Sequence, residues 1–166
     1  RFERVYHVDF YSMGELKIIL EQSAGRLDLS IESEAATELA RRSRGTPRTA
    51  NRLLLWVRDF SQARRDGTIS HETSREALAM EAVDEVGLDA LDRQYLRTII
   101  EQYGGGPVGV EAIAATMNEE SDTLVDVIEP YLLRTSFVQR TRGGRRAAPA
   151  AYAHLNLKIP EGLQHE

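Results

Sequence analysis

The sequence of 166 residues contains no cysteine, a single tryptophan and no apolar run long enough to cross a membrane. The lack of cysteine excludes disulfides, thiolate zinc sites and cysteine nucleophiles, and it suits a reducing compartment. A membrane-spanning helix needs about 20 consecutive apolar residues, and the first residues, RFERVYHVDFY, lack the apolar core of a signal peptide. We therefore expect a cytoplasmic protein with no membrane contact.

Motifs for metal or nucleotide chemistry are also missing. The chain has four histidines, His7, His71, His154 and His165. They are scattered and form no i, i+4 pair, so we expect no metal site. No G-x-x-x-x-G-K-[ST] segment and no acidic Walker-B strand can be recognised. The glycine-rich segment YGGGPVG lacks the lysine and is interpreted as a turn between helices. The sequence thus predicts a chain that cannot hold ATP and Mg²⁺ by itself.

What the chain has in abundance is helix-forming sequence. Four amphipathic helices are predicted in the first half: residues 13–26, 32–43, 47–64 and 70–83. Their candidate N-caps are Ser12, either Ser30 or Ser33, Thr46 and Ser70. Trp56 is interpreted as part of their core, and most Asp and Glu residues as solvated helix faces or i, i+4 partners. The short acidic segment DEVGLD follows Val83, where this unit is expected to end.

The second half follows a different pattern, with three helices before two short strands. The helices are predicted over residues 88–103, 108–118 and 121–136, and the third is opened by Ser121. Pro130 is expected either to bend this third helix or to mark its last turns. The strands, in FVQRT and RRAAPAAY, flank the pair Gly143-Gly144, which is expected to form their turn. Three helices followed by a hairpin are typical of a winged helix-turn-helix domain. The predicted fold class is therefore mainly α: a four-helix domain, then a winged helix with a small β-hairpin wing.

Charge is unevenly distributed along a chain whose net charge is −5. Residues 1–83 carry 13 basic and 13 acidic side chains, whereas residues 84–166 carry 8 basic and 13 acidic ones. Five of those eight basic residues lie within thirteen residues that contain no acid: Arg134, Arg140, Arg142, Arg145 and Arg146. An acidic domain that gathers its arginines on one wing predicts an anion site, and behind a helix-turn-helix the expected anion is the nucleic-acid phosphate. A solvated hairpin without a partner is the alternative.

Another arginine, Arg48, has an unusual position in the segment RRSRGTPRTANRLLLW, residues 41–56. Thr46 and Pro47 mark a helix start, which places Arg48 in the first turn. A cation there opposes the helix dipole, which favours negative charge at that end. The arrangement is explained if a strong anion binds there, held by the helix amides and the guanidinium together. The alternative is an exposed arginine that tolerates a small dipole penalty.

Long stretches of the sequence resemble one known family. Four stretches carry the resemblance: RRSRGTPRTANRLLLWVRDFSQ with DGTIS, GLDALDRQYLRTIIEQYGGGPVGVEAIAATM, TLVDVIEPYLLRTSFVQRT, and AYAHL. They are similar to the C-terminal part of the RuvB family, bacterial Holliday-junction branch-migration motors of the AAA+ class. The resemblance implies that residues 1–11 end the large ATPase domain, that residues 12–83 form its lid, and that residues 84–166 form a winged-helix head.

The resemblance also implies an activity and partners. The full-length protein would be an ATP-hydrolysing DNA translocase of recombination and repair, acting as a homo-hexamer on duplex DNA and Holliday junctions. The large domain, missing from this sequence, would hold Mg²⁺ and bind the junction-binding partner RuvA. The alternative is a stand-alone winged-helix transcriptional regulator with a helical companion domain, although a regulator has no use for the GTPR and RF segments.

Three residues are implied to lie at the ATP site. Arg48, in GTPR, matches the sensor-2 arginine, which reaches the γ-phosphate from the lid. Tyr11, in DFY, matches an aromatic beside the base. Arg1, in the opening RF, matches an arginine at the end of the large domain that serves in related motors as a finger to the neighbouring subunit's ATP.

The resemblance assigns the wing arginines to DNA. Arg140 and Arg145 match wing residues that touch DNA, and Arg142 and Arg146 are secondary candidates beside them. The wing has RTRGGR where the family usually has RTPRGR, so its charge is kept while its contacts differ in detail. Near the N-terminus, Glu3 stands where the family usually has glycine.

Overall fold

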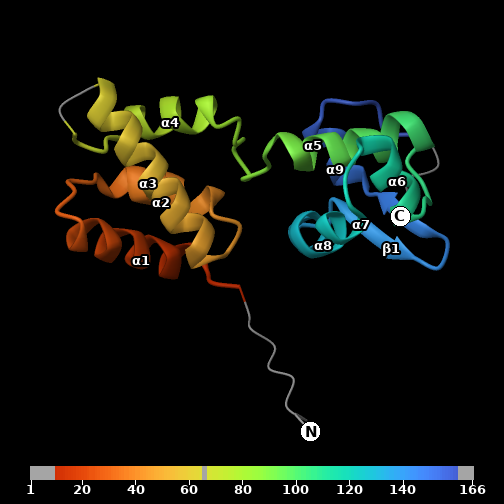
Figure 1. Cartoon of the computed structure of the whole chain (residues 1–166), viewed down its shortest axis with the longest axis horizontal. Coiled ribbons are helices and arrows are strands. Elements are labelled where there is room, and N and C mark those ends of the chain that lie inside the picture. Colours follow the sequence, from red (N-terminus) through yellow and green to blue (C-terminus); the bar gives the residue numbers. More distant parts are fainter. Residues whose placement is uncertain (1–9, 65–66, 161–166) are drawn as a thin grey trace, which may run out of the picture. The chain divides into compact units, whose positions relative to one another are not determined.

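The computed structural model describes residues 10–64 and 67–160, in two compact units that divide between Leu88 and Asp89 (Figure 1). Within the described residues, the first unit comprises α1 (Met13–Arg26), α2 (Ser33–Arg42), α3 (Pro47–Arg64) and α4 (His71–Met80). The second comprises α5 (Ala90–Arg97), π-helical η1 (Thr98–Gln102), α6 (Val110–Met117), α7 (Ser121–Thr123), π-helical η2 (Leu124–Ile128), α8 (Glu129–Arg134), β1 (Val138–Thr141), β2 (Gly144–Ala147) and α9 (Pro149–His154). The predicted fold class, mainly helical with a two-stranded hairpin, is confirmed.

The four helices of the first unit enclose one apolar core. On α1 the buried residues Leu16, Leu20 and Ala24 recur every four positions and so share one face. Residues of α2, α3 and α4 complete the core: Ala35, Leu39, Leu53, Leu54, Val57, Ala77 and Leu78. Trp56 packs against this core as expected, and its indole N–H donates to the Ala77 carbonyl at 2.8 Å.

Three of the predicted helix caps in the first unit are confirmed: Ser12, Thr46 and Ser70. The prediction that Ser30 or Ser33 caps α2 is wrong. Its N-cap is Glu32, which makes no side-chain capping bond to α2, because its carboxylate instead accepts the backbone N–H of His71 at 2.9 Å. The hydroxyl of Ser33 accepts a hydrogen bond from Lys17. The start of α2 is thus fixed by contacts from distant parts of the chain.

The segment after α4 folds back onto the first unit. The helix ends at Met80, not at Val83 as predicted, and Ala82 takes a left-handed φ of 55°. Arg42 donates through Nη1 to the Val83 carbonyl at 2.8 Å, and Arg44 donates through Nε to the Gly87 carbonyl at 2.9 Å. Gly87 has a φ of +86°, and a Cβ there would lie 2.7 Å from the carbonyl oxygen of Arg42. The acidic segment is therefore fastened to the end of α2.

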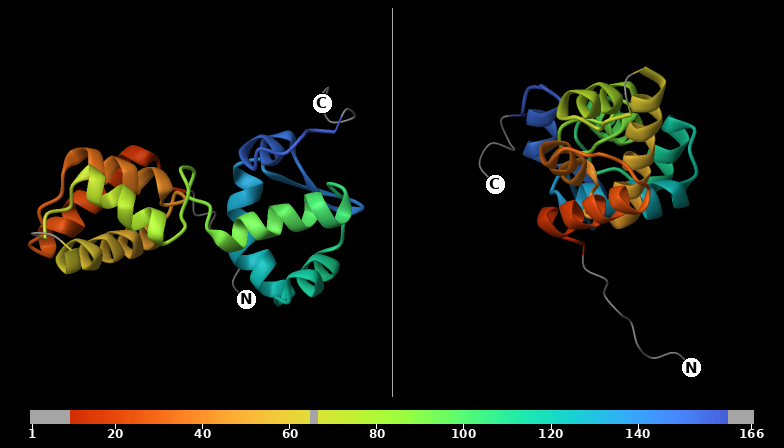
Figure 2. Two further views of the ribbon diagram at one scale, coloured as in Figure 1. Left: turned by 90° about the horizontal axis from the view of Figure 1, so that it is seen from above. Right: turned by 90° about the vertical axis from the view of Figure 1, so that its left-hand side faces the viewer.

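The first helix of the second unit changes its hydrogen-bonding pattern part-way. It begins at Ala90, two residues later than predicted, because the Asp89 carboxylate caps the N–H groups of Leu91 and Asp92. From Thr98 the α-helix continues directly into the π-helical η1, the long green ribbon of Figure 2, left. The chain then turns at Gly104-Gly105-Gly106, all at positive φ, which confirms that YGGGPVG is a turn between helices.

The third helix of the second unit is divided into α7, η2 and α8. Pro130 occupies the first turn of α8, directly after the π-helical η2. Since proline has no N–H and its ring crowds the preceding turn, it disrupts the regular α-helical pattern, and here the preceding turn is π-helical. The helix ends at Arg134, so Pro130 marks its last turns, which is one of the two predicted outcomes. The helix begins at Ser121, as predicted, and its N-cap is Glu120, which makes no side-chain capping bond.

The wing is an antiparallel hairpin of β1 and β2. Its register pairs Arg140 with Arg145 and Thr141 with Gly144, so Arg142-Gly143 forms the turn and the predicted turn Gly143-Gly144 is wrong by one residue. Gly144 lies in β2 with a φ of +127°. Behind the hairpin, the backbone of Val108 pairs with Arg145 through two hydrogen bonds of 2.7 and 3.0 Å. A Cβ on Gly144 would lie 2.2 Å from the Val108 carbonyl oxygen.

Gly144→Ala is therefore expected to destabilise the second unit by roughly 2–4 kcal/mol, through a strained φ and a backbone clash. The loss would be measured by urea unfolding followed by circular dichroism, together with amide exchange of Val108 and Arg145. Gly109→Ala is the matched control, because Gly109 has an ordinary φ of −68°. It is expected to cost less than about 1 kcal/mol. Equal losses in the two variants would contradict this explanation.

Candidate functional site

The turn Gly45-Thr46-Pro47 brings together two residues predicted to bind a nucleotide. The hydroxyl of Thr46 accepts the N–H of Thr49 at 3.3 Å and so starts α3, with Arg48 exposed in its first turn. Tyr11 donates its backbone N–H to the Gly45 carbonyl at 2.8 Å, and its side chain is 41% exposed. Tyr11 and Arg48 thus lie on either side of one turn, at an open helix N-terminus.

Among residues 10–64 and 67–160, no acidic side chain neutralises the positive end of α3. Its first turn contains no acidic residue, and within the part of the chain that the structure describes Arg48 has no carboxylate partner. The helix dipole and the guanidinium therefore add at this point, which favours an anion. Arg1, the third residue predicted at the nucleotide site, lies outside the described residues.

Two arginines that precede this turn, Arg41 and Arg42, make contacts within the first unit. Arg41 and Arg42 both bind the buried carboxylate of Glu38, and Arg42 also holds the Val83 carbonyl. Burial raises the pKa of Glu38, but the hydrogen bond from Arg41 and the charge of Arg42 outweigh it and hold the pKa below 4.5. The i, i+3 and i, i+4 spacing of Glu38 to these arginines is the signal in the sequence for this cluster.

In the second unit, two of the wing arginines predicted to bind DNA, Arg140 and Arg145, converge on one carboxylate, that of Glu129 at the start of α8. Arg140 donates to Glu129 through Nε at 2.9 Å and also through Nη2. Arg145 donates through Nε at 2.7 Å and through Nη2 at 3.3 Å. Tyr95, from α5, adds its hydroxyl at 2.7 Å. The structure therefore brings Arg140 and Arg145 together, but through an acid that was interpreted as part of a solvated helix face.

Glu129 is 0% exposed, and its ionisation depends on these partners. Burial raises its pKa, yet the hydrogen bonds from Arg145, Tyr95 and Arg140 outweigh burial and hold the pKa below 4.5. Burial and the bond to Glu129 also raise the pKa of Tyr95, so its hydroxyl keeps its proton and donates. The stabilisation from ionised Glu129 is present above the ordinary carboxyl pKa and is lost as the pH falls through the lowered value.

The four wing arginines differ in how exposed their side chains are and in which face of the hairpin they occupy. The side chain of Arg140 is 49% exposed, whereas that of Arg145 is 19% exposed. Arg142 is exposed in the hairpin turn, and Arg146 is half-buried opposite Gln139. Since neighbouring strand residues point to opposite faces, Arg146 lies on the other face of the wing from Arg140 and Arg145. Cations are therefore presented on both faces and at the tip.

Comparison with known proteins decides what these units are. Residues 11–84 match the family profile described as the RuvB AAA lid domain, and residues 85–156 match the profile of the RuvB C-terminal winged helix domain. The Holliday junction branch migration complex subunit RuvB of Desulfosudis oleivorans is 54% identical over 158 residues, which are 95% of this chain and 46% of the relative. The chain belongs to the RuvB family.

Solved RuvB structures have the same fold. The Holliday junction branch migration motor RuvB of Thermotoga maritima superposes with a TM-score of 0.89 at 44% identity, over 92% of this chain and 51% of that one. A single-residue mutant of the same protein gives a TM-score of 0.92 over 96% of this chain and 53% of that one. The chain thus spans about half the length of the RuvB proteins it matches. Because both units match RuvB domains, the alternative of a stand-alone regulator is not supported.

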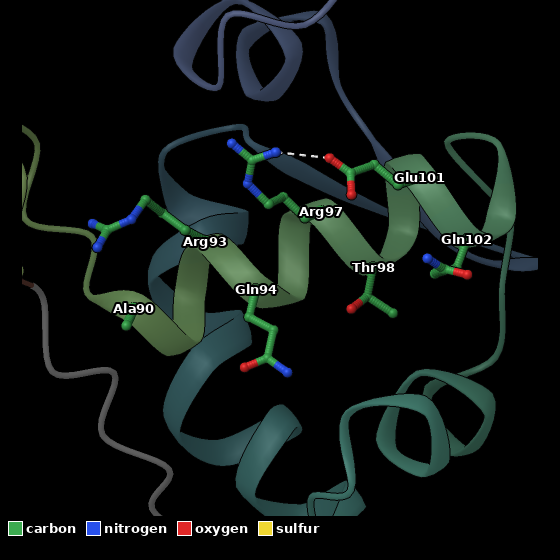
Figure 3. A pocket seen from close by; sticks show the side chains of 7 residues that line it. All are labelled: Ala90, Arg93, Gln94, Arg97, Thr98, Glu101 and Gln102. Carbon is green, nitrogen blue, oxygen red and sulfur yellow. Dashed lines mark hydrogen bonds and ion pairs between the residues drawn. The ribbon is translucent and has the colours of Figure 1, made fainter.

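The winged helix domain also carries a shallow hollow along α5 and η1, away from the residues assigned by resemblance to RuvB (Figure 3). Its lining residues are Ala90, Arg93, Gln94, Arg97, Thr98, Glu101 and Gln102. Arg97 donates to Glu101 one turn further on at 2.7 Å, so part of the hollow is an exposed ion pair within one helix. None of the predicted DNA or nucleotide residues lines it.

Residues 10–64 and 67–160 form no group of three or more histidine, aspartate or glutamate side chains that could bind a metal ion. None of their helices combines the length and the apolar character that crossing a membrane requires.

Proposed function

We propose that this chain is the lid and winged-helix head of an ATP-driven DNA translocase that moves Holliday junctions in recombination and repair. In this proposal residues 1–11 end the large ATPase domain, residues 12–83 are the lid, and residues 84–166 are the head. The observation that carries it is the exposed cation of Arg48 at the start of α3, which has no carboxylate partner among the described residues, in a lid of the RuvB family. A motor needs such a group, because the lid must sense whether the γ-phosphate is present.

At the ATP site, Arg48 contacts the γ-phosphate as sensor 2, and Tyr11 lies beside the base. Arg1 belongs to the same site and is the candidate finger to the ATP of a neighbouring subunit. The support is that Tyr11 and Arg48 flank the Gly45-Thr46-Pro47 turn with exposed side chains. Mg²⁺ and the phosphate loop belong to the large domain, whose phosphate-loop motif does not occur within residues 1–166.

At the DNA site, the wing binds phosphates of the duplex through Arg140, Arg142 and Arg146, and Arg145 adds charge while it holds the wing to α8. The support is that Arg140 and Arg142 are exposed, whereas Arg145 is mostly covered and paired with Glu129. Phosphate contacts carry no sequence information, which suits a motor that must release and bind again at successive base pairs.

The assembly and location are proposed on the same grounds. The full-length protein is a cytoplasmic homo-hexamer around duplex DNA, and it binds RuvA through the large domain. The full-length protein is expected to hydrolyse ATP faster when four-way-junction DNA is added. Phosphate release with and without the junction tests the proposal, and turnover that junction DNA leaves unchanged would count against it.

The chain of residues 1–166 is expected to show no ATP turnover and to bind ATP very weakly, because its sequence has no phosphate-binding loop. Calorimetric titration with ATP and a phosphate-release assay measure both quantities. The full-length protein is the positive control. Turnover above the buffer background in a purified sample of the chain would contradict the expectation.

A further inference from the structure

Glu129 is a fully buried carboxylate placed directly behind a wing that the proposed function requires to be positive. The start of α8, where it lies, packs against β1 (Figure 1). A buried carboxylate is costly unless it is paired and hydrogen-bonded. Here the carboxylate accepts five hydrogen bonds from three side chains.

The two oxygens of Glu129 serve different partners. Oε1 accepts from the Tyr95 hydroxyl and from Nε of Arg145. Oε2 accepts both bonds from Arg140 and the longer bond from Arg145. Arginine has five N–H donors, and Arg140 uses its Nε and Nη2 groups on Glu129 while half of its side chain stays exposed. Its Nη1 group makes no bond to residues 10–64 or 67–160, which leaves it available to a partner outside the protein.

The register of the hairpin explains why an acid is needed here. Arg140 and Arg145 are directly opposite each other across β1 and β2. Like charges in that position repel and destabilise a hairpin. Glu129 lies between the two guanidinium groups and bonds to both, so both arginines can occupy one face of the wing.

We propose that Glu129 is a positioning residue for duplex binding, which holds Arg140 in the orientation that contacts a phosphate. The inference rests on the proposed function of the wing. A free arginine loses rotamer freedom when it binds a phosphate, whereas an arginine that is already held loses less and binds more tightly. The opposite role is a neutralising one, in which Glu129 only lowers the positive charge of the wing. The two roles predict changes of opposite sign.

The variant Glu129→Gln distinguishes the positioning role from the neutralising role. The amide can still accept from Tyr95 and Arg145 through its oxygen, but it then turns an N–H₂ group toward Arg140 and releases it. Although the variant gains one positive charge, duplex affinity is expected to fall about fivefold at ~0.15 M salt, and the slope of log affinity against log salt to flatten by about one unit. The measurement is a fluorescence-anisotropy titration of residues 1–166 with a mixed-sequence duplex at several salt concentrations.

Asp126→Asn is the matched control for charge, because Asp126 is exposed on the adjoining η2 and neutralising it adds the same charge. Its affinity is expected to equal or exceed that of the wild type. Tyr95→Phe is the control for stability, since it removes one donor to Glu129 and leaves both arginine pairs. It is expected to lower the melting temperature and to leave the salt slope unchanged.

Arg140→Lys keeps the charge at a half-exposed position where folding is not at risk, and it cannot make the two parallel bonds to Oε2. It is expected to weaken duplex binding in the same way as Glu129→Gln. Glu129→Gln binding as tightly as the wild type or more tightly would overturn the proposal, as would a flattened slope in Tyr95→Phe. A wild-type chain with no salt-dependent duplex binding would instead overturn the proposed function of the wing, on which this role depends.

Discussion

Arg48→Ala in the full-length protein is expected to lower ATP turnover roughly tenfold or more. A charge-assisted contact in a closed site contributes about 1.5–3 kcal/mol, and its loss falls on the transition state if Arg48 contacts the γ-phosphate. The lid should keep its fold, because Arg48 is exposed and its removal takes a cation away from a helix N-terminus. The measurement is steady-state phosphate release, normalised to the folded fraction.

Arg52→Ala provides the matched control for this experiment. Arg52 is one turn further along α3, exposed, and paired with Glu81 at 3.2 Å. Exposed ion pairs of this kind contribute about 0–1 kcal/mol, so the control should leave turnover within about twofold of the wild type. If Arg48→Ala lost thermal stability while each folded molecule kept normal turnover, Arg48 would be a structural residue and its sensor role would be wrong.

The double variant Arg140→Ala, Arg142→Ala is expected to weaken duplex binding by about 25-fold at ~0.15 M salt. Each lost phosphate contact reduces the salt slope by about one unit, which corresponds to about fivefold in affinity at that salt concentration. The loss should be the same on unrelated duplexes, since phosphates carry no base information. Titration of two unrelated duplexes at several salt concentrations measures both quantities.

Arg97→Ala is the control for this loss of charge, because Arg97 is exposed on α5 in the same domain and paired with Glu101. It should keep the wild-type salt slope. Arg145→Ala should affect stability more than the slope, because Arg145 is mostly covered and holds Glu129. A loss of affinity confined to one of the duplexes would show sequence reading and would contradict a wing that grips phosphates alone.

The sequence predicted the elements whose causes are local. The helix Pro47–Arg64 begins where predicted, because its cap Thr46 directly precedes Pro47 and the spacing of Leu53, Leu54 and Val57 lies within it. A disturbance of the helix at Pro130 was likewise predicted from the chemistry of one residue. Its form, a π turn from Leu124 to Ile128, depends on how the helix packs and has no local signature.

The sequence predicted the arginines of the candidate DNA site but not the buried carboxylate of Glu129 that binds two of them. A run of arginines without acids is visible in the sequence, but the partner of Arg140 is 11 residues away and that of Arg145 is 16 residues away in the chain. Glu129 shares no helical spacing with either, and only the packing of α8 against β1 brings them together. Glu38, by contrast, is three and four residues from its arginines and follows the i, i+4 rule.

The segment Val83–Leu88 is held in place along its whole length by bonds within the first unit. Six residues of flexible chain would span roughly 13 Å and could take many positions. Here Arg42 holds the Val83 carbonyl and Arg44 that of Gly87, and the Asp84 carboxylate accepts the N–H groups of Val86 and Leu88 at 3.1 and 2.9 Å. A displacement of the first unit that begins near Arg48 would therefore carry Leu88, the last residue of that unit, with it, because no loose segment lies between them to absorb the movement.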